Sequence, residues 1–286
     1  MARRLKLITG LSTIAVTGAL ALAGCGAEGE GEGASAAASG VQVNGQGEGE
    51  GEGAAAPAPA PAQPAGGEGE GGVDFDAAAT DPVVFNSALA IAEAHALAAR
   101  DAYVAGRKEV AAEMFAHPVS EVLADMEAAF AARGVETMND LFSDASAGVL
   151  AEETPEQIAA KTAAIVAALH AAAEKAPADG RPASAISAGV VSDQIDRAVD
   201  MYRLAAATGA YGNYLDGYGF FRAAESAFGR GRELIEKENP AAATQIALAL
   251  TALGAVYPSA TAPDAINGDI AALSAASSRV MLALRR

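Results

Sequence analysis

The sequence predicts an all-α protein, an antiparallel bundle of about seven to nine helices that follows a long linker. From about residue 80 onward, apolar residues recur at spacings of three and four, as on one face of a helix. Residues that start and stop helices separate these stretches. No stretch shows the sustained alternation of β-branched residues that is typical of strands. We therefore expect a targeting segment over 1–24, a linker over 25–76 and one helical domain over 77–286.

The N-terminal segment has the features of an export signal. Three cations lie within residues 3–6, and residues 7–23 are apolar with small polar interruptions. This run is shorter than the ~20 solidly apolar residues that a membrane-spanning helix needs, and its flanks are those of a secretory signal. Cys25 follows this run after Gly24 and is the single cysteine of the chain, so it has no partner for an internal disulfide.

The residues Leu-Ala-Gly-Cys that end at Cys25 resemble the lipobox of bacterial lipoproteins. The resemblance covers residues 1–25. It implies that the signal peptide is removed and that acyl chains are attached to Cys25, which would anchor the protein durably in a lipid bilayer. In Gram-negative lipoproteins an aspartate after the cysteine commonly signals retention in the inner membrane. Gly26 at that position implies the outer membrane, facing the periplasm.

The linker is a low-complexity segment. Between residues 26 and 72, Gly-Glu repeats surround a run of alternating alanine and proline. Glycine gives the backbone freedom, the like charges repel one another, and the Ala-Pro run favours an extended conformation. Such residues cannot form a core, so we expect the linker to separate the folded part from the membrane surface.

The chain is strongly acidic. Its formal net charge is −17, and it becomes about −20 when the three cations leave with the signal peptide. An acidic surface repels nucleic-acid phosphates and anionic lipid headgroups. The charge therefore predicts no nucleic-acid partner, and it predicts that the membrane is bound through acylated Cys25 rather than through a basic patch.

The first helices are predicted from their start and stop residues. Asp81 is a helix cap before Pro82, a proline at the first helical position. An apolar face then runs from Phe85 to Tyr103, and Gly106 ends the helix. A short helix follows to Phe115. The next helix is predicted to begin at His117-Pro118 and to end at Gly134.

Four further helices are predicted. They are a helix that follows a capping box at 154–157 and ends at Pro177, a stripe from Val191 to Ala206 that ends near Gly209, a helix from Asn239-Pro240 to Tyr257, and a segment from Pro263 with heptad-like apolar residues through Leu284.

Alanine supplies much of the 51% hydrophobic content. A buried alanine methyl contributes about one methylene's worth of free energy, against roughly 1.5–3 kcal/mol for a larger apolar side chain. The bundle therefore depends on close approach of its helices.

A candidate metal site uses two of the three histidines. His95 lies on the first helix and faces partly inward, while His117 and Glu121 are one helical turn apart. If the two helices are neighbours, these side chains could bind a divalent metal such as iron, copper or zinc. In the alternative interpretation His117 caps a helix, Glu121 suits a helix N-terminus and His95 is a core residue. His170 is predicted to be structural.

Two other polar or aromatic groups stand out. Residues 211–221 contain five of the fourteen aromatic residues, which predicts either a dense core patch or a ligand-binding wall formed by Tyr214, Asp216 and Tyr218. Packing is the simpler interpretation. A cluster of charges on one helix is predicted to form intrahelical pairs on a solvated face: Asp193, Asp196, Asp200, Arg197 and Arg203.

No constellation of catalytic residues is evident. The chain contains no nucleophile elbow, and lipidation would consume Cys25. We therefore predict a protein that is not an enzyme and needs no cofactor: a cell-envelope lipoprotein whose acidic bundle binds a periplasmic partner protein or a small ligand. The first alternative is a periplasmic bundle that binds metal through His95, His117 and Glu121. The second is an enzyme with an Asp or Glu acid–base pair, which no residue spacing supports.

Overall fold

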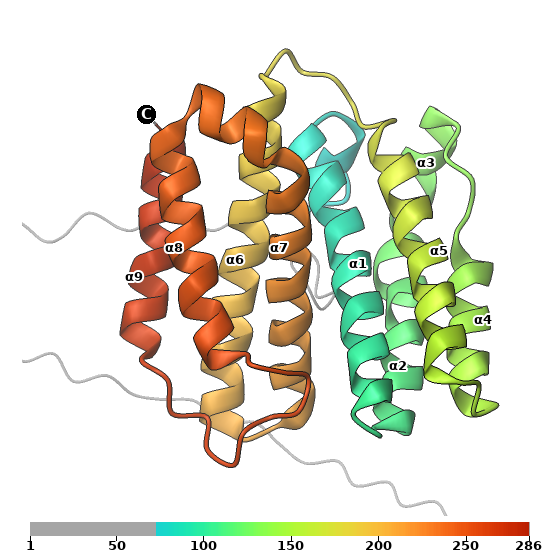
Figure 1. Ribbon diagram of the computed structural model, residues 1–286. Coiled ribbons are helices and arrows are strands. Elements are labelled where there is room, and N and C mark those ends of the chain that lie inside the picture. The colour runs from blue at the N-terminus through green and yellow to red at the C-terminus, as the bar shows by residue number, and fades with distance from the viewer. Residues whose placement is uncertain (1–72, 286) are drawn as a thin grey trace, which may run out of the picture. The chain divides into compact units, whose positions relative to one another are not determined.

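The computed structural model of the chain describes residues 73–285 and confirms the all-α prediction, with nine α-helices and no strand in that range (Figure 1). The predicted signal peptide, Cys25 and nearly all of the predicted linker lie outside the described residues. After a 3-10 turn at Ala77–Ala79, the helices are α1 (Pro82–Val104), α2 (Lys108–Pro118), α3 (Glu127–Arg133), α4 (Asn139–Leu150), α5 (Pro155–Ala173), α6 (Ala183–Thr208), α7 (Tyr211–Glu238), α8 (Pro240–Val256) and α9 (Ile270–Leu284).

The long helices form two groups of four. In the N-terminal group, α1 packs against α2 and α5, and α4 packs against the same two helices. In the C-terminal group, α6 packs against α7 and α9, and α8 packs against the same two. Helix α1 also packs against α7 and α6, so it belongs to the N-terminal group and touches the C-terminal one (Figure 1).

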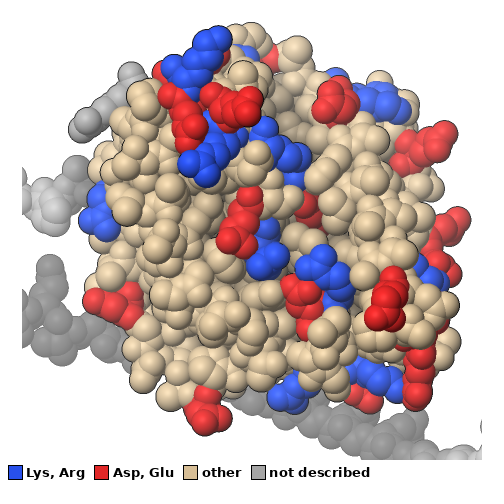
Figure 2. Space-filling view, in the orientation of Figure 1, with Lys and Arg blue, Asp and Glu red and all other residues tan. Residues whose placement is uncertain are grey.

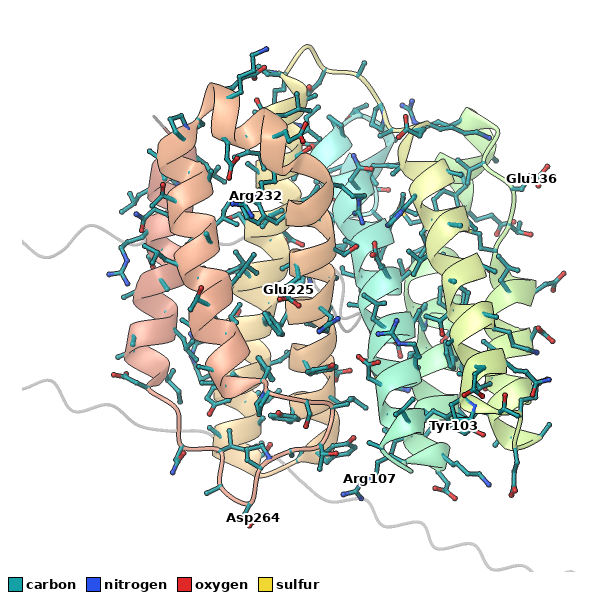
Figure 3. All side chains as sticks on the ribbon, in the orientation of Figure 1. Tyr103, Arg107, Glu136, Glu225, Arg232 and Asp264 are labelled. Carbon is teal, nitrogen blue, oxygen red and sulfur yellow. The ribbon has the colours of Figure 1, made fainter. Side chains whose placement is uncertain are left out.

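Helix α1 starts at a capped end and is buried along most of its length. The Asp81 side chain accepts hydrogen bonds from the amides of Val83 (2.7 Å) and Val84 (3.2 Å), as a cap before a proline should. Near the other end, the hydroxyl of Tyr103, labelled in Figure 3, donates to the Glu153 carbonyl at 2.5 Å. Among the described helices α1 alone is long and apolar enough to cross a membrane, but 83% of its apolar window is buried, as in a core helix.

The chain does not start a helix at His117-Pro118, as the sequence predicted. Instead α2 continues through Pro118 and passes directly into a π-helical turn, Val119–Leu123. Proline lacks the N–H of an α-helical bond and its ring crowds the preceding turn, and the α-helical pattern changes to a wider π-helical turn directly after it. Helix α3 is separate, and it ends at Gly134 in the left-handed conformation (φ 62°), as predicted.

Helix α7 is 28 residues long although it contains five glycines. Glycine costs about 1 kcal/mol in a helix interior relative to alanine, but three of these glycines, at 217, 219 and 231, lie where other parts of the chain come close. A Cβ on Gly219 would lie 2.6 Å from the Ala94 carbonyl oxygen of α1. A Cβ on Gly217 would lie 1.8 Å from the Tyr257 hydroxyl. Their missing side chains therefore let α7 pack closely against α1 and against the end of α8.

The last helix begins later than the sequence predicted. Helix α9 starts at Ile270, after Asp269, whose side chain accepts a hydrogen bond from the Ala272 amide at 2.9 Å. Ile266 matches the heptad-like spacing but lies in the loop before this cap. The loop is fixed to α6 because the Gly268 amide donates to the Tyr202 hydroxyl at 2.8 Å.

Candidate metal centre

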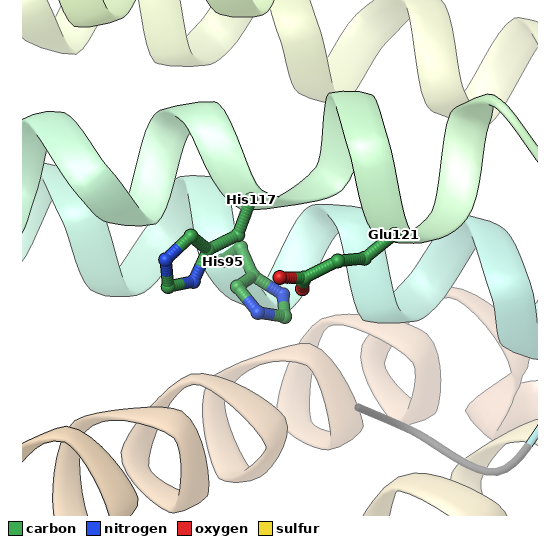
Figure 4. A group of neighbouring side chains, drawn as sticks. All are labelled: His95, His117 and Glu121. Atoms are coloured by element: carbon green, nitrogen blue, oxygen red, sulfur yellow. The ribbon is translucent and has the colours of Figure 1, made fainter. Parts of the chain in front are cut away.

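His95, His117 and Glu121 come together where the widened end of α2 lies over α1 (Figure 4). One donor atom from each side chain lies within 4.8 Å of the other two. His95, from the middle of α1, is only 3% exposed, while His117 and Glu121 are half-buried. The two imidazole rings meet edge to face, with centroids 6.0 Å apart. The structure therefore brings together the three residues of the candidate metal site.

The backbone of α1 orients the His95 ring. Its Nδ1 atom lies 2.9 Å from the Ile91 carbonyl oxygen. A carbonyl can only accept a hydrogen bond, so Nδ1 carries a proton, and in the neutral form of the ring Nε2 is then the nitrogen with the lone pair. Histidines that bind metals are commonly oriented in this way, with the second ring nitrogen bonded to a carbonyl or carboxylate. His95 is therefore prepared to coordinate an ion through Nε2.

His117 fits a ligand role for a different reason. Its Nδ1 atom is buried and makes no hydrogen bond within the described part of the chain. Leaving a buried polar atom unsatisfied costs about 1–3 kcal/mol, and coordination of a metal ion would remove that cost. The helix continues from His117 through Pro118 into the π-helical turn, so Glu121 follows His117 by about one turn.

His95 also borders a pocket of about 330 Å³ against the C-terminal group. The side chains that line it with His95 come from α6 and α7: Arg197, Asp200, Met201, Leu204, Asn213, Asp216 and Phe220. Phe220 packs edge to face against the His95 ring, with centroids 6.1 Å apart. An oxygen of Asp216 lies 4.0 Å from His95 Nε2. The pocket therefore adjoins the candidate metal site on the side of α7.

The predicted ligand-binding wall does not form as one surface. Tyr214 is buried and its hydroxyl donates to the Ser259 carbonyl at 2.9 Å. Tyr218 is also buried, and its hydroxyl donates to Asp101 of α1 at 2.7 Å. Burial raises the pKa of Tyr214 to about 12 and, together with the Asp101 hydrogen bond, raises the pKa of Tyr218 well above its ordinary value. Both tyrosines serve packing, and only Asp216 borders the pocket.

The charged cluster on α6 pairs largely as predicted. Arg197 donates to Asp193 at 2.8 Å and Arg203 to Asp200 at 2.6 Å, both within the helix. Asp196 differs, because it accepts a hydrogen bond at 2.8 Å from Ser277 of α9. It therefore links two helices of the C-terminal group.

A second buried polar cluster was not predicted from the sequence. Glu93, on α1 and 2% exposed, accepts a hydrogen bond from Ser226 (2.5 Å) and lies 3.0 Å from His170 Nε2. Burial acts to raise the pKa of Glu93, but the His170 hydrogen bond, the Arg230 charge and the Ser226 hydroxyl outweigh it, so the pKa is lowered. The sequence feature that could have revealed this cluster is Glu93, an acidic residue among the alanines of α1. The structural role predicted for His170 agrees with its place in the cluster.

Comparison with known proteins gives one finding, for the C-terminal part of the chain. No curated protein and no solved structure has significant similarity to it. Residues 211–284 match the model of a family described as the iron permease-associated 4-helix bundle domain. The match spans α7, α8 and α9 and includes Asp216, whereas His95 and the π-helical turn lie outside it. Three helices of the C-terminal group are therefore similar to a domain that is associated with iron permeases.

Proposed function

We propose that this protein captures a transition-metal ion, with iron as its cargo, at the membrane of the cell envelope. The observation that carries the proposal is the convergence of His95, His117 and Glu121, whose donor atoms lie within 4.8 Å of one another. Two imidazoles and a carboxylate are donors that suit Fe²⁺, Zn²⁺ and Cu²⁺ alike. The family match to an iron permease-associated domain favours iron among these ions.

The geometry requires only a small adjustment on binding. Nitrogen and oxygen ligands lie about 2.0–2.2 Å from a bound ion, so two ligands of one ion lie at most about 4.4 Å apart. The separations in the cluster are at most 4.8 Å, so they exceed this limit by no more than about 0.4 Å. Glu121 has a long side chain, so a change of its rotamer is enough to close the site.

Membrane attachment through acylated Cys25 is part of the same proposal. The export signal, the cysteine and the Gly-Glu linker support it, and an association with permeases fits a membrane location. On the face that Figure 2 shows, the described basic side chains lie next to acidic ones and form no continuous basic patch. This face therefore offers no basic patch for anionic lipid headgroups, which favours a lipid anchor as the means of attachment. The outer-membrane location and a periplasmic protein partner stay predictions.

Metal titration of the full-length chain in detergent tests the metal site. After removal of bound metals, we expect equilibrium dialysis against Fe²⁺ without oxygen to load about one ion per chain. His117→Ala should weaken binding at least about tenfold, because the loss of even a residue that supports a ligand has that effect. His170→Ala is the matched control, since this third histidine contacts Glu93 and lies outside the site. The proposal fails if the parent chain takes up no iron, copper or zinc, or if the two variants bind equally.

A further inference from the structure

Asp216 of α7 lies at a distance from His95 that suits two ligands of one ion. The Asp216 oxygen is 4.0 Å from Nε2 of His95, the ring nitrogen that does not face the Ile91 carbonyl. This separation is too long for a direct hydrogen bond between the two atoms. It is within the limit of about 4.4 Å for two ligands that share an ion.

We propose that Asp216 is a fourth protein ligand of the metal centre, an inference that rests on the proposed function. The donor set then contains two imidazole nitrogens and two carboxylate groups. Two carboxylates neutralise the charge of a divalent ion in this largely buried place, where an uncompensated charge is costly. The added oxygen ligand also makes the site harder, which favours iron over copper.

The fourth ligand would make the centre a contact between the two groups of helices. His95, His117 and Glu121 all come from the N-terminal half of the described chain, whereas Asp216 comes from α7 of the C-terminal group. Metal sites in helical bundles are commonly built in this way, from side chains on facing helices. The ion would then join α7 to α1 directly.

The backbone of α7 fixes where Asp216 lies. Gly219 permits contact with α1 at Ala94, the residue before His95. Phe220, one turn beyond Asp216 on the same helix, packs against the His95 ring. These two contacts, at adjacent residues of α7, hold this part of the helix against α1 beside His95. The Asp216 side chain is 19% exposed and borders the 330 Å³ pocket, which provides an entry path for an ion.

The substitution Asp216→Asn tests this assignment in the full-length chain, because it keeps the size of the side chain and removes its charge. We expect the affinity for Fe²⁺ to fall about 10- to 100-fold, with an unchanged circular dichroism spectrum. Asp200→Asn is the matched control. Asp200 borders the same pocket, but its side chain is half exposed and pairs with Arg203, so its loss should change the affinity by less than about twofold.

A spectroscopic measurement separates coordination from an indirect effect. Loaded with Co²⁺, the parent chain and Asp216→Asn should differ in their d–d absorption bands, because one oxygen donor has been replaced. If Asp216→Asn binds as tightly as the parent while His117→Ala does not, the fourth ligand is overturned and the three-residue site stands. Identical Co²⁺ spectra for parent and Asp216→Asn also overturn it. A parent chain that binds no metal overturns both proposals.

Discussion

At the scale of single residues, Asp81 connects the start of α1 with a distant loop. Its carboxylate caps α1 through the amides of Val83 and Val84, and it accepts a hydrogen bond at 2.5 Å from Arg181, a hundred residues later. Burial acts to raise the pKa of Asp81, but the hydrogen bonds from Arg181 and from the two amides outweigh it, so the pKa is lowered. One side chain therefore contributes both to a helix end and to a tertiary contact.

This arrangement predicts the effect of substitution and of pH on stability. Asp81→Ala should lower the free energy of unfolding by about 1 kcal/mol, as expected for a lost cap. Because the folded-state pKa lies below the ordinary value of 3.8, the ionised Asp81 contributes stability above about pH 4 and loses it as the pH falls through the folded-state pKa. Urea unfolding at pH 7 and at pH 3 measures both effects.

The control separates the charge from the cap. Asp81→Asn keeps a capping oxygen but cannot ionise, so its stability should fall less between pH 7 and pH 3 than that of the parent chain. The two losses of stability should differ by less than about 1 kcal/mol, since the ion pair of Asp81 with Arg181 is partly open to solvent. Asp264→Asn, on the exposed loop before α9 (Figure 3), should behave as the parent does. If the parent and Asp81→Asn lost the same free energy of unfolding between pH 7 and pH 3, the charge of Asp81 would contribute nothing to stability.

At the scale of elements, the glycines of α7 determine how closely this helix approaches α1. Gly219→Ala would place a Cβ 2.6 Å from the Ala94 carbonyl oxygen, a backbone atom that cannot move aside alone. We expect a loss of stability of about 1–3 kcal/mol, as for overpacking in a core. The metal affinity should also fall, because the displacement would move Asp216 and Phe220 away from His95.

Gly229→Ala is a matched control on the same helix. A Cβ at Gly229 meets no atom within 4 Å, so the exchange should stabilise the helix by up to about 1 kcal/mol through helix propensity alone. Thermal unfolding of the two variants beside the parent measures the contrast. Melting temperatures that move in the same direction would show that contact with α1 does not explain the glycine at 219.

The helix ends show which structural features local sequence patterns predict correctly. The predicted cap at Asp81, the glycine stop at Gly134 and the start of α8 after Asn239 are all confirmed, and so is the capping box between Thr154 and Gln157. These features depend on residues within one turn of each other, which a sequence displays directly. The continuation of α2 through Pro118 into a π-helical turn was missed because a proline usually marks a helix boundary and spacing patterns do not reveal such a turn.

The candidate site likewise has features that local sequence patterns predict and one that they do not. The pairing of His117 with Glu121 and the inward position of His95 follow from helical spacing. The approach of Asp216 to His95 does not, because it depends on the contact of Gly219 with Ala94 across the two groups of helices. Asp216 was noted in the sequence for its aromatic neighbours, and no local pattern linked it to a histidine 121 positions earlier.

At the scale of the whole molecule, the predicted lipid anchor gives a further test. Cys25→Ser should transfer the protein from the membrane fraction to the soluble fraction, because the acyl chains would have no attachment site. Mass spectrometry of the parent chain should show a mature N-terminus at Cys25 with added lipid. Ser39→Ala, in the linker, is the control and should remain in the membrane fraction. A Cys25→Ser variant that stays bound to the same extent contradicts the anchor.

In the folded bundle three of the proposed ligands, His95, His117 and Glu121, lie within 4.8 Å of one another, and Asp216 lies 4.0 Å from His95, although the chain separates the first from the last by 121 positions. The unfolded chain does not hold these side chains together, so an ion at this centre binds the native state alone. By mass action, a concentration one hundred times the dissociation constant would then add about 2.7 kcal/mol to the free energy of unfolding. Iron binding and folding would then be thermodynamically coupled. Without iron the bundle would be less stable, and unfolding would release the iron.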